Sequence, residues 1–137
     1  MISNPKHGWC KFNLGDFIGY PSYTTNIPLD LLNFFIGYFN GETEACWLDE
    51  EGGGFTLVVT PYSLFVISEQ SNLEEPKLLD FSYINVKCLA KELVNDIKNN
   101  MYEWCEFSIY DDDEEEIKLN REKLRTKILT LERLIGE

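Results

Sequence analysis

Three carboxylates and three glycines stand together in WLDEEGGGF, residues 47–55. Neighbouring carboxylates can act as acid and base when their environments differ, and glycine-rich loops can bind phosphate through backbone N–H groups. A phosphate loop, however, needs glycines that lead into a helix, usually with a lysine, whereas these glycines lead into a strand rich in β-branched residues. Water solvates Asp49, Glu50 and Glu51 fully if they lie at a bend. The stretch therefore predicts a hairpin turn, and neither a catalytic site nor a phosphate site is expected there.

A second acidic run, residues 111–116, raises the question of calcium. Four carboxylates match the first, third, fifth and twelfth positions of an EF-hand loop: Asp111, Asp113, Glu115 and Glu122. The sixth position is Glu116, although the sharp turn of such a loop requires glycine there. Acidic residues in the first turn of a helix complement the positive end of its dipole, which explains the run without a metal.

Cysteine and histidine also give no sign of a reactive centre. The cysteines lie far apart, at Cys10, Cys46, Cys88 and Cys105, and His7 is the single histidine, so a zinc site is not expected. A nucleophilic pair of His7 and Cys10 would need a third group to orient the base, and His7 is expected in a mobile N-terminal segment. Neither a cleavable signal nor a membrane-spanning stretch is found in the sequence. We expect a cytoplasmic protein with reduced thiols, no metal and no cofactor.

Charge is distributed unevenly along the chain. The net charge is −12, and residues 12–76 contain ten acidic residues with neither lysine nor arginine. Such a field repels nucleic-acid phosphates and anionic lipids, while it attracts a basic protein and speeds its encounter. The alternative interpretation is that the charge serves only solubility.

The first half of the chain predicts a strand, a helix and a sheet. Alternating polar and apolar residues predict a strand at residues 9–14. Residues 28–39 are apolar on nearly every side, which predicts a buried helix, and Gly37 within it is expected to let another element approach closely. Strand-like runs at 44–49, 54–60 and 64–69, joined by turns with glycine and proline, predict an antiparallel meander. Polar residues then predict an exposed loop.

The second half predicts helices. Asn85 is expected to cap a helix that continues to about Cys105, although residues 101–110 also carry a strand pattern. Residues 117–135 predict a last helix with one apolar side. We therefore expect one α+β domain, residues 1–137, in which a small antiparallel sheet, the meander plus the N-terminal strand, packs against two to four helices.

In size, acidity and predicted fold the chain is similar in character to bacterial immunity proteins, the cognate inhibitors of polymorphic toxins that include those of contact-dependent growth inhibition. The stretches closest to signatures are WLDEEGGGF and LAKELVNDIKNNMYEW. The resemblance implies a basic protein partner, the cognate toxin domain. Many such toxins are nucleases with basic clefts, which an acidic surface can occupy in place of phosphate.

If the chain binds such a partner, aromatic side chains ringed by carboxylates are the expected contacts. The candidates surround the predicted hairpin and its neighbouring turns: Glu42, Glu44, Trp47, Asp49, Glu50, Glu51 and Tyr62. Two other classes of protein fit the same sequence. One is an acidic nucleic-acid mimic or adaptor that acts on a basic protein. The other is a small cytosolic enzyme with an aromatic-lined pocket, which an enclosed pocket with a buried carboxylate would favour.

Overall fold

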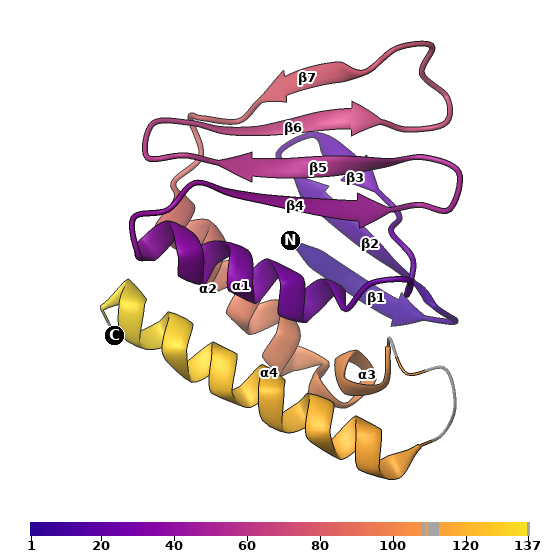
Figure 1. Ribbon diagram of the computed structural model, residues 1–137, viewed down its shortest axis with the longest axis vertical. Coiled ribbons are helices and arrows are strands. Elements are labelled where there is room, and N and C mark those ends of the chain that lie inside the picture. The colour runs from indigo at the N-terminus through magenta and orange to yellow at the C-terminus, as the bar shows by residue number, and fades with distance from the viewer. Residues whose placement is uncertain (108, 110–112, 137) are drawn as a thin grey trace.

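The computed structural model describes residues 1–107, 109 and 113–136, which form two antiparallel sheets and four helices (Figure 1). The three-stranded sheet contains β1 (Ile2–Lys6), β2 (Trp9–Leu14) and β3 (Phe17–Gly19). The four-stranded sheet contains β4 (Glu44–Asp49), β5 (Gly54–Val59), β6 (Leu64–Glu69) and β7 (Lys77–Asp80), in that order. The helices are α1 (Ile27–Phe39), α2 (Val86–Asn99), α3 (Met101–Glu106) and α4 (Glu114–Ile135). The predicted α+β class is confirmed.

The predicted meander is present and gains a fourth strand. β4, β5 and β6 occupy nearly the expected residues, and β7 pairs antiparallel with β6, with Val66 opposite Leu79. β7 has only four residues, of which three are exposed. So short a strand leaves no alternating pattern, which explains why the sequence did not reveal it.

The N-terminal segment differs from the prediction in two ways. β2 does not join the meander's sheet but pairs with β1 and β3 in a sheet of its own. The chain turns back after β2 at Gly15, whose φ of 57° suits glycine. β2 therefore adds no strand to the meander, and its residue Phe12 packs against Phe55 of the meander. His7 lies in the turn between β1 and β2 and not in a mobile terminus, because residues 2–6 form β1.

The ends of α1 follow the local signals in the sequence. The Oδ1 atom of Asn26 accepts a hydrogen bond from the N–H of Leu29 at 3.4 Å, and proline stands in the first turn. At the other end Gly41 adopts φ 88° directly after the C-cap residue Asn40. α1 therefore covers the predicted residues 28–39 and begins one residue earlier, at Ile27.

The predicted helix from Asn85 to about Cys105 is two helices. Asn85 caps α2 as expected, with its Oδ1 accepting from the N–H of Cys88 at 3.0 Å. The continuous helix was wrong because Asn100, with φ −135° and ψ 42°, breaks it. α3 then starts in a new direction and buries Trp104 and Cys105. Residues 108 and 110, which the strand alternative included, lie outside the described residues.

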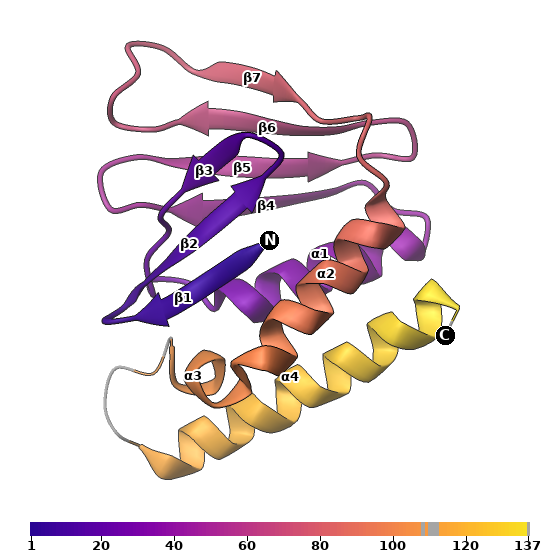
Figure 2. The ribbon, with the colours of Figure 1, turned by 180° about the vertical axis from the view of Figure 1, so that it is seen from behind.

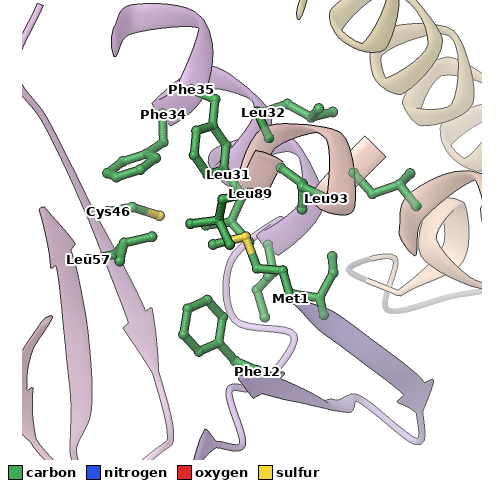
Figure 3. Close-up of a cluster of buried hydrophobic side chains, with 14 of the residues drawn as sticks. Met1, Phe12, Leu31, Leu32, Phe34, Phe35, Cys46, Leu57, Leu89 and Leu93 are labelled. Atoms are coloured by element: carbon green, nitrogen blue, oxygen red, sulfur yellow. The ribbon is translucent and has the colours of Figure 1, made fainter. Parts of the chain in front are cut away.

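The core lies between the four-stranded sheet and the elements that cover one of its faces. The three-stranded sheet crosses behind the four-stranded sheet in Figure 1 and in front of it in Figure 2. The ring of Phe55 lies 5.0 Å from that of Phe12 and 4.9 Å from that of Phe17, measured between centroids. Figure 3 shows Phe12, Leu31 and Leu57 meeting in one cluster, to which Leu93 of α2 contributes.

A chain of side-chain amides connects three helices. The Nδ2 atom of Asn26, at the start of α1, donates to Oδ1 of Asn120 on α4 at 2.8 Å. The Nδ2 atom of Asn120 in turn donates to the carbonyl oxygen of Cys105 in α3 at 2.7 Å. Asn120 is 5% exposed, so these bonds satisfy polar groups that water does not reach freely.

Candidate protein-binding surface

The four-stranded sheet has two faces of different surroundings. Side chains of directly paired residues in an antiparallel sheet point to the same side. Cys46, Leu57 and Val66 are paired across three strands and face the core. The residues directly before and after each of them in its strand therefore face the opposite side of the sheet. The residues of this second face, here called the outer face, are Ala45, Trp47, Asp49, Thr56, Val58, Phe65, Ile67, Glu69, Leu78 and Asp80.

The centre of the outer face is apolar and open. Figure 1 shows no helix or strand of the described residues in front of it. Trp47 is 41% exposed and Leu78 is 63% exposed, and Ile67 and Phe65 lie half-buried on the strand between β5 and β7. Exposed apolar patches on a globular domain commonly mark binding sites. The outer face therefore has the composition of the centre of a protein interface.

Carboxylates surround this apolar centre. Asp49 and Glu69 stand at one end of the outer face, where both pair with Gly54, the first residue of β5. Asp80 stands at the other end, where it pairs with Phe65. Glu74 and Glu75 are exposed in the loop between β6 and β7. An apolar centre with a charged rim is the usual anatomy of a protein–protein contact, and here the rim carries one sign of charge.

The structure separates the predicted contact residues into two groups. Trp47 lies on the outer face, and Asp49, Glu50 and Glu51 lie beside it at the hairpin. The others, Glu42, Glu44 and Tyr62, lie at the opposite end of the sheet, because Glu44 pairs with Val59 just before the next turn. Along β4 the chain advances by five residues from Glu44 to Asp49, which places the two ends about 17 Å apart. Tyr62 is 93% exposed there.

Two of the three hairpin carboxylates bind neighbouring segments. Oδ2 of Asp49 accepts from the hydroxyl of Thr24 at 3.0 Å, and Oε2 of Glu50 accepts from the N–H of Tyr20 at 2.8 Å. Gln70 also donates to this Oε2, at 3.3 Å. Asp49 and Glu50 thus hold the segment that follows β3 against the hairpin while they add negative charge. Glu51 is exposed and adopts φ 55°.

Backbone conformation and close packing explain why the hairpin contains glycines. Gly52 adopts φ 134°, a conformation that side chains disfavour. A Cβ atom on Gly54 would lie 2.5 Å from the backbone oxygen of Leu48, so the two strands could not approach as they do. The predicted turn is confirmed, and Gly52 and Gly54 are needed for its backbone conformation and for the close approach of its two strands.

Sequence reasoning found Trp47 but missed the rest of the apolar centre. Val58, Phe65, Ile67 and Leu78 were assigned to strands without a face. The available signal was the composition of β5 and β6, which are apolar at consecutive positions where a strand with one solvated face alternates with polar residues. Such strands either are covered on both faces or expose an apolar one.

A groove of about 370 Å³ lies between α1 and the edge strand β4. Its lining residues come from both elements and from the turn before α1: Thr25, Asp30, Asn33, Phe34, Glu44, Ala45, Cys46 and Trp47. Burial raises the pKa of the Asp30 carboxyl. Burial, and then a hydrogen bond and the negative charge of Glu42, raise the pKa of Glu44.

Gly37 makes room for one of these carboxylates. A Cβ atom at this position of α1 would overlap the side chain of Glu44, whose Cδ atom would be 2.5 Å away. The expected close approach at Gly37 is confirmed, and the approaching group is the Glu44 carboxyl from β4.

The buried thiols are weak nucleophiles at neutral pH. Burial raises the pKa of Cys10 to about 12. Burial, followed by the charges of Asp30 and Glu44, also raises the pKa of Cys46 to about 12. Because the thiolate is the reactive form of cysteine, neither side chain is activated for attack.

Asp113, which belongs to the acidic run, is the N-cap residue of α4. Oδ1 of Asp113 accepts from the N–H groups of Glu115 and Glu116, at 3.1 and 3.2 Å. Asp111, the first position of the calcium pattern, lies outside the described residues. Across residues 1–107, 109 and 113–136, no three His, Cys, Asp or Glu side chains are placed to hold a metal ion together.

Asp30→Asn is expected to raise the free energy of unfolding at pH 7 by less than about 1 kcal/mol, because the group is half exposed and water screens its charge. With a raised pKa, folded Asp30 holds its proton more tightly than unfolded Asp30, so stability falls as pH rises from the ordinary value of 3.8 through the raised value. Asparagine lacks this penalty. Urea unfolding at pH 7 and pH 3.5 measures the gain, which should vanish at the lower pH. Asp16→Asn, at an exposed turn, is the control, and an equal gain there would contradict the assignment.

Comparisons of the chain with models of protein families, with curated proteins and with solved structures found no match. None of the helices in the described part of the chain has the length and apolar character needed to cross a membrane. Function is therefore inferred from the geometry and charge of this chain.

Proposed function

We propose that this chain is an acidic binding protein that neutralises a basic protein partner, as an immunity protein inhibits its cognate toxin. The observation that carries the proposal is the outer face, an open apolar surface with Trp47 on its β4 side and carboxylates at its rim. It belongs largely to residues 12–76, which lack lysine and arginine altogether. Aromatic anchors inside a charged rim are typical of interface hot spots.

The two parts of the surface would contribute differently to binding. The carboxylates attract a basic surface over a distance of about 10 Å at moderate salt, which raises the association rate. The apolar centre loses its water on contact and sets how long the complex lasts. In a nuclease toxin the carboxylates would occupy the basic cleft in place of phosphate and so block the substrate.

Co-expression tests this function directly. The products of the reading frames that adjoin this one are expressed singly in a bacterial host, with and without the chain. One product is expected to arrest growth, and the chain is expected to bind it and restore growth. If the chain binds a product but leaves the arrest unchanged, it is no immunity protein. If it binds no basic protein among them or in a lysate of its native cell, the binding proposal fails as well.

Leu78→Lys is expected to weaken binding of that partner at least tenfold, because it places a cation in the apolar centre opposite a basic surface. Leu129→Lys on α4 is a matched control, since Leu129 is 62% exposed, against 63% for Leu78, and lies away from the sheet. Isothermal titration of each variant with the purified partner measures the affinity. Equal losses in the two variants would show that net charge, and not the outer face, determines binding.

A further inference from the structure

We propose that the groove between α1 and β4 is an anchor site for one arginine side chain of the partner. The inference rests on the proposed function and names a second contact beside the outer face. Trp47 belongs to both surfaces, because it lies on the outer face and also lines the groove. A partner seated on the outer face would thus have the groove at the edge of its footprint.

The charges of the groove are uncompensated. Asp30 lines the groove from α1 and Glu44 lines it from β4, so both walls of the groove carry a carboxyl group. The Glu44 carboxyl lies against Gly37, two helical turns from Asp30, so the two carboxyls stand at different points along the groove. A nearby cation would lower their pKa values, and no such lowering effect acts on either carboxyl among the described residues. Among the described residues neither carboxylate takes part in a salt bridge. Asp30 is a half-buried carboxylate without a cation, and a bound cation would relieve the cost of its burial.

A buried hydroxyl in the same place also lacks a partner. The Oγ1 atom of Thr25 exposes less than 1 Å² and has no hydrogen-bond partner among the described residues, and Thr25 lines the groove. Most buried polar atoms in proteins are hydrogen-bonded, so an exception calls for a ligand or another specific reason. A turn of the Thr25 side chain about its Cα–Cβ bond would bring this oxygen to the groove, where an N–H donor of a bound side chain would supply the missing bond.

The shape and lining of the groove favour arginine. Its volume of about 370 Å³ is near the lower end of the range for ligand sites, and it is open along one side, which suits a single side chain from another protein. A guanidinium is planar, donates up to five hydrogen bonds and stacks on aromatic faces. Trp47 also lines the groove, and its indole is an aromatic side chain of the kind on which a guanidinium stacks. A lysine ammonium would hold its water more strongly and would not stack.

Gly37 allows the site to be tested without changing its charge. A Cβ atom at residue 37 meets only atoms of the Glu44 side chain within its three nearest contacts, and this side chain is flexible. Gly37→Ala is therefore expected to move the Glu44 carboxylate out of its place. The fold should tolerate the change, because alanine is the better helix former.

Titration with N-acetyl-L-arginine amide, followed by ¹H–¹⁵N NMR, tests the proposal without the partner. The indole N–H resonance of Trp47 is expected to shift in a saturable manner with a Kd on the order of 1–10 mM. N-acetyl-L-citrulline amide, which is neutral and of the same shape, should give no saturable shift. Asp30→Asn and Gly37→Ala are each expected to weaken arginine binding at least fivefold, whereas Glu69→Gln at the far rim should change it less than twofold.

The pH dependence provides a second readout. Burial raises the pKa of Asp30, and burial together with the hydrogen bond and charge of Glu42 raises the pKa of Glu44, so both begin to take up protons at a higher pH than ordinary carboxyls. Affinity for the arginine probe should therefore fall as the pH is lowered from 7.5 to 5. An equal response to the citrulline probe, or an unchanged affinity in Asp30→Asn, would overturn the arginine site.

This outcome is separate from the fate of the proposed function. If the probe does not bind but Leu78→Lys still abolishes partner binding, the groove is no anchor site and the outer face alone carries the function. If the probe binds as expected but no basic protein partner exists, the groove is a cation site and the proposed function is wrong.

Discussion

Phe55→Ala is expected to lower the free energy of unfolding by about 3–5 kcal/mol, the range for a buried phenylalanine that leaves a cavity. Phe55 is fully buried, and its ring forms edge-on or tilted contacts with Phe12 and Phe17 of the other sheet. Gly19 of β3 lies so close that a Cβ atom there would overlap the ring. One side chain thus joins the two sheets. Because an ordinary domain is stable by only about 5–15 kcal/mol, a loss of this size removes at least about a fifth of that stability.

The control for this prediction is Phe65→Ala. Phe65 lies on the adjacent strand β6 but points to the outer face, where it is only half-buried. Its removal should cost about 1 kcal/mol, because less apolar surface returns to water. Urea unfolding followed by tryptophan fluorescence compares the two variants. A loss from Phe65→Ala equal to that from Phe55→Ala would mean that the outer face is covered in solution.

Asn120→Ala is expected to lower the free energy of unfolding by about 2–4 kcal/mol. The change removes the bonds to Asn26 and to the carbonyl of Cys105, and it leaves that carbonyl without its donor. The carbonyls in the last turn of a helix have no partner within the helix, so Cys105 depends on Asn120. A buried polar group left without a hydrogen bond costs about 1–3 kcal/mol.

Asn95→Ala, at an exposed position of α2, separates this effect from a general preference for alanine in helices. It should change stability by no more than about 0.5 kcal/mol in either direction. Urea unfolding followed by circular dichroism at 222 nm measures both variants. A similar small effect of Asn120→Ala would show that the amide chain does not hold the helices together.

Local signals predicted most of the elements. Asn26 and Asn85 are polar residues placed just before apolar helical patterns, and each caps the helix that the pattern predicts. The break at Asn100 was not predictable in the same way, because the apolar spacing continues through it into α3. Whether such a pattern belongs to one helix or two depends on where Trp104 can be buried, which is a property of the whole fold.

The candidate site was harder to predict, for reasons of distance. Tyr62 and Asp49 are only 13 positions apart, yet an extended strand between them places them at opposite ends of the sheet. Asp30 was visible in the sequence as a carboxylate in an otherwise apolar helix, and this was the available sign of the groove. That Glu44 meets it there depends on the packing of α1 against β4, which no local pattern encodes.

The outer face also determines how copies of this chain behave toward one another. An open apolar sheet face beside the free edge of β7 would ordinarily invite self-association. Each copy, however, presents the same ring of carboxylates within a net charge of −12, so two copies repel each other before their apolar centres can meet. Under the proposed function the rim would therefore discriminate between partners, because it attracts a protein of opposite charge and repels a second copy of the same chain.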